Sequence, residues 1–347
     1  MEALAKAHTN IALIKYWGKR DETLFLPMNS SLSITLDAFY TTTSVEFCSC
    51  LKSDMFVLNG NLTNEEETKK ISNFLDKVRA LAGVNLHAMV SSVNNVPTSA
   101  GFASSASGFA ALALAATKAI GLDIDHSIVS RIARQGSGSA CRSVYGGYVE
   151  WEKGVAADGS DSYASPIMDG EAWDLSILSV MVDSRNKKVL SREGMKRTVD
   201  TSPFYSGWLD TVEEDLEIAK GAIINRDFGL LGKVVEANAL KMHATTLGAD
   251  PPFTYFQGAT LDVMEAVKQM RAEGVPVYFT IDAGPNVKVL CQPENEAYVQ
   301  KVLAAIPTVQ SIYLCHPGPG AKVLSRSSLS GTSKKMLNQF HHHSCTN

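Results

Sequence analysis

The sequence contains no apolar run of the length needed to cross a membrane. Its first ten residues, MEALAKAHTN, also lack the apolar core of a signal peptide. From these two absences we expect a cytoplasmic protein that has no membrane partner.

Cysteine is scarce, with six residues in a chain of 347, at positions 48, 50, 141, 291, 315 and 345. Cys48 and Cys50 form a single C-x-C, but no second pair completes the spacing of a zinc site, so the support for a metal site is weak. In a chain without an export signal, we expect these cysteines to be free thiols in a reducing compartment.

An excess of positive charge is also absent, because 32 Lys and Arg stand against 36 Asp and Glu, a net charge of −4. A general nucleic-acid binder is usually basic, so we expect no nucleic-acid partner. Any polyanionic ligand must then be bound by a local basic pocket and by backbone donors. No dinucleotide fingerprint follows a strand, and no Ser-His-Asp order is evident.

The apolar patterns that are present predict a mixed α+β protein of ordinary globular composition, 45% hydrophobic and 20% charged. A strand at 86–93, a Gly/Ser loop and a buried helix follow one another, an order that places the loop where a phosphate is held. Residues 182–202 are predicted as loops. The other predicted elements are strands at 5–17, 148–151, 175–183 and 310–315, paired strands within 31–47, helices at 64–81, 126–135, 209–225, 228–246, 259–273 and 294–305, and a hairpin at 277–291.

The chain length allows two domains. We expect an N-terminal α+β domain at 1–183 that carries the phosphate-binding loop, and a C-terminal α+β domain at 184–324. The Ser-rich tail at 325–347 has no periodicity and is predicted to be mobile.

The first candidate site is the stretch GFASSASGFA, residues 101–110. Ser104, Ser105 and Ser107 suit the first turn of a helix, and the apolar residues that follow predict a helix buried on every side up to Ile120. The N-terminus of this helix offers unpaired N–H donors and a positive dipole end, which suit a phosphate. Serines that merely cap the helix are an equally good interpretation of this stretch alone.

A second Gly/Ser loop, QGSGSACR, covers Gln135 to Arg142. Gly138 lets the backbone approach a ligand closely, and Arg142 adds a planar fork for a carboxylate or a phosphate. One such loop is a common composition, whereas two in one domain favour two anionic ligands.

Charged residues mark three further candidate positions. KYWGKRD, residues 15–21, and the basic group in SRNKKVLSREGM, residues 184–195, suit either a solvated surface or a wall that grips a phosphorylated molecule. Asp282 follows the apolar run VYFTI and precedes a turn, where a carboxylate is costly unless a partner compensates it. By composition alone, an Asx-type turn explains Asp282 better than a general base does.

Four long stretches of the sequence together resemble the mevalonate diphosphate decarboxylase family. They are AHTNIALIKYWGKRDETLFLPMNSSLSITL, PTSAGFASSASGFAAL, QGSGSACRSVYGGYVEW and FTIDAGPNVKVL. The resemblance extends from about residue 5 to about residue 324 and does not include the tail. Because this family belongs to the galactokinase, homoserine kinase, mevalonate kinase and phosphomevalonate kinase superfamily, the resemblance implies a two-lobed small-molecule kinase fold with a ligand cleft between the lobes.

The resemblance also implies a reaction. ATP phosphorylates the 3-hydroxyl of mevalonate 5-diphosphate, the phosphate leaves, and carbon dioxide is lost to give isopentenyl diphosphate and ADP. The implied cofactors are ATP and Mg²⁺, the implied partners are these small molecules, and family members are commonly homodimers. Phosphate is a far better leaving group than hydroxide, so the reaction needs no electron-sink cofactor.

The resemblance assigns roles to residues. It makes Asp282 the catalytic aspartate, pairs Arg142 with the substrate carboxylate, and lets Lys187 or Lys188 reach the ATP phosphates. Arg142 and Lys187 are counted as catalytic together with Asp282. The implied substrate-binding residues are Tyr16, Trp17, Gly18, Lys19, Lys70 (or its neighbour Lys69), Ser137, Gly138, Ser139, Ala140, Cys141, Arg142, Ser191, Arg192 and Thr201. The implied ATP-binding residues are Pro97, Ser99, Ala100, Gly101, Ala103, Ser104, Ser105 and Ser107, with Ser105 beside a Mg²⁺ ion that the ATP phosphates mainly hold.

Two other functions are compatible with these motifs. A sister kinase of the superfamily would stop after phosphoryl transfer, and it would not be expected to pair the motifs KYWGK and GSGSACR. A non-catalytic sensor of a phosphate ligand would have no need of Asp282, Arg142 and both serine loops. Measuring ADP and carbon dioxide in one assay distinguishes the three.

Overall fold

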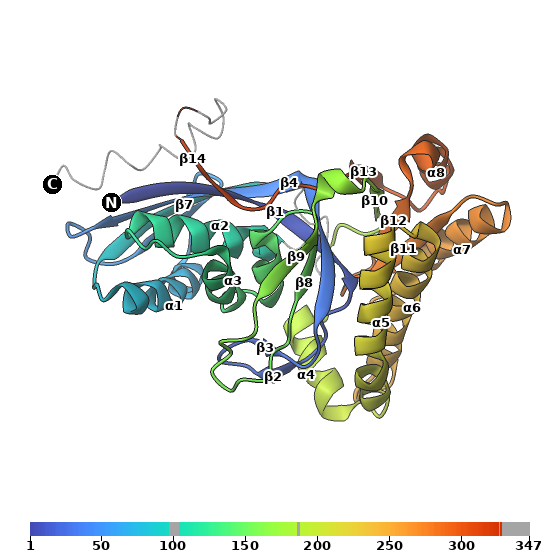
Figure 1. Cartoon of the computed structure of the whole chain (residues 1–347), viewed down its shortest axis with the longest axis horizontal. Helices are drawn as coiled ribbons and strands as arrows, with labels where there is room; N and C mark the ends of the chain where they lie inside the picture. The colour runs from blue at the N-terminus through green and yellow to red at the C-terminus, as the bar shows by residue number, and fades with distance from the viewer. Residues whose placement is uncertain (97–103, 186–187, 326, 328–347) are drawn as a thin grey trace.

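The structure is a computed structural model that describes residues 1–96, 104–185, 188–325 and 327. Two lobes lie side by side along the longest axis, each with one sheet and helices packed against it (Figure 1). The first sheet has the strand order β14-β1-β4-β7-β5-β6, and β8 and β9 extend it from β4. Its strands are β1 (Glu2–Ile14), β4 (Ser31–Cys48), β5 (Met55–Leu58), β6 (Asn61–Leu62), β7 (His87–Asn95), β8 (Tyr148–Trp151), β9 (Ala164–Met168) and β14 (Lys322–Leu324).

Helices of the first lobe cover one face of this sheet (Figure 1). They are α1 (Glu65–Ala82), α2 (Ser104–Ala119), α3 (His126–Arg134) and the 3-10 helix η1 (Gly138–Val144). A second 3-10 helix, η2 (Gly170–Ala172), follows β9 in the chain. Helix α2 lies against β1 and β4, and its residues from Ala110 to Thr117 are all buried. This confirms the prediction of a helix enclosed by protein. Helix α1 begins where the pattern predicts, because the side chain of Asn64 accepts a hydrogen bond from the Glu67 amide.

The second lobe is built on an antiparallel sheet with the order β11-β12-β10-β13. Its strands are β10 (Ser176–Met181), β11 (Val277–Ile281), β12 (Val287–Cys291) and β13 (Ser311–Cys315), and a separate small hairpin pairs β2 (Lys19–Asp21) with β3 (Leu26–Pro27). The helices that follow β10 in the chain are α4 (Ser191–Thr201), α5 (Tyr205–Asn225), α6 (Phe228–Leu247), α7 (Gly258–Ala272), the 3-10 helix η3 (Pro293–Asn295) and α8 (Glu296–Ala304).

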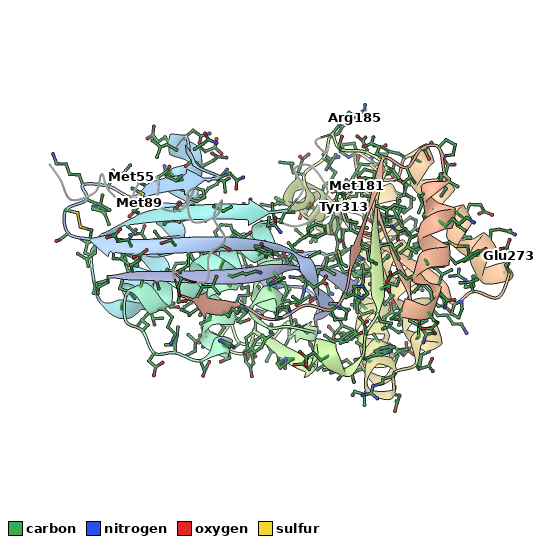
Figure 2. The ribbon with its side chains drawn as sticks, turned by 90° about the horizontal axis from the view of Figure 1, so that it is seen from above. Met55, Met89, Met181, Arg185, Glu273 and Tyr313 are labelled. Carbon is green, nitrogen blue, oxygen red and sulfur yellow. A yellow bond between two sulfur atoms is a disulfide. The ribbon has the colours of Figure 1, made fainter. Side chains whose placement is uncertain are left out.

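The two ends of the molecule can be followed in side-chain detail (Figure 2). Met55 and Met89 face each other across the parallel β5–β7 pair in the first lobe. Met181 and Tyr313 mark the second sheet, where β10 pairs with β13, and Glu273 lies at the far end of the second lobe. A continuous apolar core joins the lobes, since residues of β1 belong to the same buried cluster as residues of α5 and α6.

The chain crosses between the two sheets more than once. The strand β10 lies in the second sheet although it precedes residue 183, and β14 returns to the first sheet to pair with β1. The division of the chain at residue 183 therefore stays a prediction. No helix in the described part of the chain is long and apolar enough to span a membrane.

Two of the secondary-structure predictions are wrong. Residues 31–47, predicted as paired strands, form one long strand, β4, which continues through a shift in its register with β1 between His8 and Asn10. Residues 191–201, predicted as loop, form α4. Only Gly194 and Thr198 of this helix are fully buried, and Met195 and Val199 beside them pack partly buried against the core. The i,i+4 ion pairs Lys196–Asp200 and Arg197–Glu193 add support on its exposed side.

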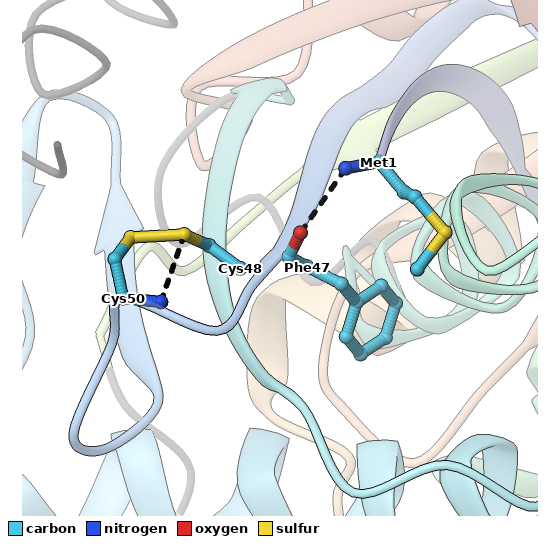
Figure 3. The surroundings of a disulfide bond; sticks show 4 residues. All are labelled: Met1, Phe47, Cys48 and Cys50. Carbon is cyan, nitrogen blue, oxygen red and sulfur yellow. Dashed lines mark hydrogen bonds between the residues drawn. A yellow bond between two sulfur atoms is a disulfide. The ribbon is translucent and has the colours of Figure 1, made fainter.

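The expectation of free cysteines is also wrong at one place. Cys48 and Cys50 form a disulfide just after the end of β4, and the Cys50 amide donates a hydrogen bond to the Cys48 sulfur (Figure 3). Next to it, the N-terminal amine of Met1 donates to the Phe47 carbonyl at 3.1 Å. A tight turn brings the two thiols together, which a two-residue spacing alone does not reveal. The buried cysteines 141, 291 and 315 are free.

Candidate functional site

A cavity of about 440 Å³ lies between the lobes, a volume typical of small-molecule sites. Both lobes contribute to it, the first through β1 and the loops after it, the second through α4, α6 and the loop after β11. The residues that line it are Asn10, Ala12, Lys15, Tyr16, Trp17, Lys19, Phe25, Ser104, Ser105, Ser137, Gly138, Ser139, Arg142, Ser191, Arg192, Met195, Met242, Asp282 and Ala283.

Three helices begin at this cavity. Ser104 and Ser105 start α2, Ser137 precedes η1, and Ser191 starts α4. The hydroxyls of Ser105 and Ser137 are 3.3 Å apart, so the two Gly/Ser loops meet at one place. The N-cap residues of η1 and α4, Ser137 and Leu190, make no side-chain capping hydrogen bond within the described structure. Backbone N–H groups and positive dipole ends therefore converge with hydroxyls, an arrangement suited to phosphate groups.

The charged side chains of the cavity are mostly positive. Lys15, Lys19, Arg142 and Arg192 line it, and Asp282 is the one acidic residue among the described lining residues. The cavity is therefore the local basic pocket that an acidic protein needs in order to bind a polyanion.

Arg142 is buried in this pocket, with 2% of its surface exposed. Its Nη1 donates to Ser31 Oγ at 2.7 Å and its Nη2 to Asn10 Oδ1 at 3.2 Å, and burial lowers the pKa of the guanidinium. Asn10 is itself fixed, because its Nδ2 donates to Ser143 Oγ at 2.7 Å. Within the described residues, no carboxylate lies within ion-pair distance of Arg142, so its protein partners are neutral. A buried guanidinium whose protein partners are all neutral favours an anionic ligand.

Asp282 and Lys15, which both line the cavity, form an ion pair. Lys15 Nζ donates to Asp282 Oδ1 at 2.7 Å and to the Ala12 carbonyl at 2.9 Å. The Lys15 side chain is 3% exposed and that of Asp282 is 32% exposed. Burial lowers the pKa of Lys15, while the charge of Asp282 opposes that shift. The partner that a carboxylate after a buried strand requires is therefore Lys15.

The motif KYWGK forms one wall of the cavity. The Tyr16 ring lies against Trp151 with centroids 4.7 Å apart, and its buried hydroxyl has no hydrogen-bond partner in the described structure. Gly18 adopts φ +109°, and a Cβ there would overlap the Tyr205 hydroxyl, which explains why glycine stands at this position. The Lys19 ammonium pairs with Glu22 and lies 4.4 Å from the centroid of the Phe25 ring.

The structure does not bring every predicted residue to the cavity. Lys70 pairs with Glu66 on the exposed face of α1, and Thr201 donates to the Arg197 carbonyl at the end of α4. Ser107 is turned into the first lobe, where its hydroxyl lies 2.8 Å from that of Thr41. The other predicted residues that do not line the cavity are Gly18, Ala140 and Cys141, the last two being buried behind it.

Several predictions lie outside the described residues and stay predictions. These are Lys187, Pro97, Ser99, Ala100, Gly101 and Ala103. Lys188 is described and lines a different cavity beside Tyr255.

Sequence reasoning assigned no individual role to seven residues of the cavity: Asn10, Ala12, Lys15, Phe25, Met195, Met242 and Ala283. Lys15 had a detectable signal, because it directly follows the buried strand IALI just as Asp282 follows VYFTI. Two opposite charges, each at the end of a buried strand, require partners and can supply them to each other.

Among the described residues, no group of three or more His, Cys, Asp or Glu could hold a metal ion by itself. Mg²⁺ does not require such a group, because it commonly binds through one or two protein oxygens, water and substrate phosphates. The Ser105 hydroxyl and the Asp282 carboxylate supply oxygens of this kind to the cavity. The residues present therefore fit a Mg²⁺ ion that arrives with a phosphorylated substrate.

The two-lobed α+β fold and its cationic interlobe cleft, entered by helix N-termini, define a protein of the small-molecule kinase type. Comparison with family models refines this class. A model described as "Diphosphomevalonate decarboxylase-like N-terminal domain" matches residues 7–164, and one described as "Mevalonate 5-diphosphate decarboxylase C-terminal domain" matches residues 177–341. The second match continues past residue 324, where the motif resemblance ended.

Individual relatives agree with the family models. The diphosphomevalonate decarboxylase of Saccharomyces cerevisiae is 39% identical over 329 residues, which cover 88% of this chain and 82% of the relative. A solved structure of mevalonate diphosphate decarboxylase from Staphylococcus aureus is 47% identical with a TM-score of 0.89, covering 93% of this chain and 98% of its own. Another, described as MDDEF in complex with MVAPP, AMPPCP and magnesium, is 50% identical with a TM-score of 0.88, covering 94% and 99%. This chain belongs to the diphosphomevalonate decarboxylase family.

Proposed function

We propose that this chain catalyses the ATP-dependent decarboxylation of mevalonate 5-diphosphate. The 3-hydroxyl oxygen bonds to the γ-phosphorus of ATP and ADP leaves. The C3–O bond then breaks, inorganic phosphate departs, and the electrons of the bond to the carboxylate form the new double bond as carbon dioxide leaves. The products are isopentenyl diphosphate, ADP, phosphate and carbon dioxide.

The observation that carries this proposal is the Lys15–Asp282 pair beside two Gly/Ser loops and Arg142 in one cavity. Two phosphorylated molecules and a carboxylate require several anion-binding elements around a single acid–base group. The cavity has three helix N-termini, four cationic side chains and one carboxylate among its described lining residues. A solved relative is described as a complex with MVAPP, AMPPCP and magnesium, which supports the same substrates here.

Asp282 acts on the hydroxyl that attacks ATP. Its carboxylate accepts the hydroxyl proton as the oxygen bonds to phosphorus, and Lys15 holds Oδ1 of that carboxylate in place. A tertiary alcohol is a very weak acid, so positioning and charge neutralisation supply most of the rate gain. General-base assistance of this kind is typically worth about 10²–10⁴-fold.

The other residues of the cavity orient the two substrates. Arg142 pairs with the substrate carboxylate, which keeps that group aligned with the C3–O bond that breaks. Ser137, Ser139, Tyr16 and Lys19 hold the diphosphate of the substrate. The start of α2 at Ser104 and Ser105 holds the phosphates of ATP.

Mg²⁺ accompanies ATP in this proposal. When bound, it neutralises charge that develops on the transferred phosphoryl group. Ser105 would hold the ion from the protein side, because its hydroxyl lies at the mouth of α2, and the ATP phosphates would provide most other ligands.

Three finer statements belong to the same proposal. We propose a homodimer, which light scattering of the purified chain tests, and a cytoplasmic location, which fractionation tests. We also propose that residues 1–183 and 184–324 act as the two domains around the cleft. The homodimer rests on the family resemblance, and the location and the domain bounds rest on the sequence patterns.

One assay tests the function. The purified chain is given ATP, Mg²⁺ and mevalonate 5-diphosphate, and ADP and carbon dioxide are followed together. Equal amounts of both are expected. ADP without carbon dioxide would identify a sister kinase instead, and binding without either product would identify a sensor.

A further inference from the structure

Helix α6 bonds to the backbone of Lys15 and of Ile281, the residue before Asp282, through two side chains that do not line the cavity. It lies against β1, which leads to Lys15, and against β11, which leads to Asp282. Two of its buried polar residues, Asn238 and His243, bond to the backbone at these two places. The pair joins the lobes, so a shared support on one rigid element would fix its geometry.

Asn238 holds the backbone of Lys15. Its Oδ1 accepts the Lys15 amide at 2.9 Å and its Nδ2 donates to Asp215 Oδ2 at 2.9 Å. A carboxylate only accepts, so Asp215 fixes which end of the Asn238 amide faces Lys15. Lys241 donates to both oxygens of Asp215, at 2.8 and 2.9 Å, and thereby fixes the carboxylate in turn. Asn238 is fully buried, so its own two bonds, to Lys15 and to Asp215, are shielded from water.

His243 holds the backbone just before Asp282. Its Nε2 lies 3.2 Å from the Ile281 carbonyl oxygen, which can only accept, so Nε2 carries the proton. The ring is 2% exposed and packs against Phe256 with centroids 4.4 Å apart. Burial and the nearby Lys15 charge lower the pKa of His243 to about 4, so the ring is neutral at ordinary pH.

The buried Nδ1 of His243 has no hydrogen-bond partner in the described structure, so the polar contact that fixes the ring is made through Nε2 to the backbone at the end of β11. On the far side of Asp282, Asn286 accepts the amides of Val182 and Asp183 at 2.9 and 3.1 Å. The Asp282 turn is therefore anchored on one side by α6 and on the other by the end of β10.

We infer that Asn238 and His243 are positioning residues that set the Lys15–Asp282 geometry across the two lobes. The inference rests on the proposed function for its kinetic consequence. Neither residue touches the cavity, so substrate affinity should not depend on them. The reaction depends on carboxylate placement, and an error of about 1 Å can cost about 10²-fold in rate.

The inference requires that Nε2 of His243 donates to the Ile281 carbonyl, and two substitutions test this requirement. The amide nitrogen of glutamine can reach the place of Nε2, whereas that of asparagine reaches only the place of Nδ1. His243→Gln should keep kcat within about threefold of the parent, and His243→Asn should lower kcat about 10- to 100-fold. KM for both substrates should stay within about twofold in each variant.

His8 is a matched control with the opposite geometry. It is also buried, at 4% exposed, but its Nδ1 faces the Leu36 carbonyl at 2.9 Å, and neither residue lines the cavity. His8→Gln should lower the unfolding temperature more than His8→Asn does, with kcat unchanged in both. This control separates loss of a buried histidine from loss of the Asp282 support.

A crystal structure of each variant gives a readout independent of turnover. In His243→Asn, the Lys15 Nζ to Asp282 Oδ1 distance should lengthen beyond hydrogen-bond range, while in His243→Gln it should stay near 2.7 Å. If the parent chain forms no carbon dioxide, the proposed function fails, whereas these distances still test the positioning role.

Three results would overturn the inference: a His243→Asn chain with parental kcat, a loss confined to KM, or equal loss in His243→Gln. Should His243→Asn not fold, Asn238→Ala provides the same test through the Lys15 side. It should lower kcat at least about 10-fold with KM unchanged, and parental kcat in that folded variant would equally overturn the inference.

Discussion

The Lys15 ammonium lies 2.7 Å from Asp282 Oδ1, although 267 positions separate the two residues in the chain. Each follows a buried strand, one in each lobe, and the ion pair places the only acidic side chain among the described lining residues next to the anion-binding loops. Chemistry at the cleft therefore depends on how the lobes meet.

Replacing Asp282 by asparagine removes the proton acceptor while preserving shape. We expect kcat to fall at least about 10²-fold, with binding of mevalonate 5-diphosphate retained, because the anion-binding groups remain. Calorimetric titration measures the binding of mevalonate 5-diphosphate, and an ADP-release assay measures kcat. Activity within a few-fold of the parent would remove Asp282 from the mechanism.

Replacing Arg142 by lysine keeps the charge but loses the planar fork. The bonds to Ser31 and Asn10 cannot both be kept by a single ammonium, so kcat/KM should fall at least about 10-fold. Arg134→Lys is a matched control, since Arg134 is equally buried and bonds only to backbone carbonyls of residues that do not line the cavity. It should lower stability without changing kcat, and equal kinetic losses in both variants would contradict the role of Arg142.

Phe25 links cations from the two lobes at the rim of the cavity. Its ring centroid is 4.4 Å from Lys19 Nζ and 5.3 Å from Arg192 Cζ. Each such contact is worth about 0.5–2 kcal/mol, so Phe25→Leu should raise KM for mevalonate 5-diphosphate about 3- to 10-fold. Phe253→Leu removes a similar contact with Arg197 outside the cavity and should leave KM unchanged. Steady-state kinetics at saturating ATP decides the outcome.

Gly18→Ala should be much more destabilising than Gly83→Ala. Both glycines have positive φ, +109° and +67°, so each substitution introduces backbone strain of about 1–3 kcal/mol. Only at Gly18 does the new Cβ meet Tyr205, whereas nothing lies within 4 Å of it at Gly83. Urea unfolding should show a loss of about 2–5 kcal/mol for Gly18→Ala against about 1 kcal/mol for Gly83→Ala. Equal losses would disprove the steric explanation.

Stability should fall on mild acidification because of two buried histidines. Burial lowers the pKa of His8 and His243 from 6.5 to about 4. Between these values the unfolded chain binds more protons than the folded one, so the free energy of unfolding decreases as pH falls from about 6.5 toward 4. Each histidine contributes up to about 3 kcal/mol of this loss. Urea unfolding at a series of pH values from neutral to mildly acidic should show a smaller decrease for His243→Gln than for the parent, and an identical pH dependence would contradict the assignment.

Local patterns were sufficient to predict much of the fold. The helix α1 with its Asn64 cap, the enclosed helix α2 and the hairpin of β11 and β12 occur where residue spacing predicts them. The pattern failed at α4, whose core-facing side includes only two apolar side chains, Met195 and Val199, and at β4, where one strand continues through a shift of register. In both places the apolar spacing is too short or too irregular to be recognised in the sequence.

By itself, the sequence determined the chemical inventory: two Gly/Ser loops, an arginine, and an aspartate placed where a bare carboxylate is unfavourable. These follow from residue types close together in the chain, whose consequences are local. Only the tertiary structure decided which groups meet, pairing Lys15 with Asp282, Ser105 with Ser137, and Arg142 with Ser31 and Asn10. Such contacts form because the lobes bury a shared apolar core, and that packing brings together side chains whose separation in sequence carries no information about their distance in space.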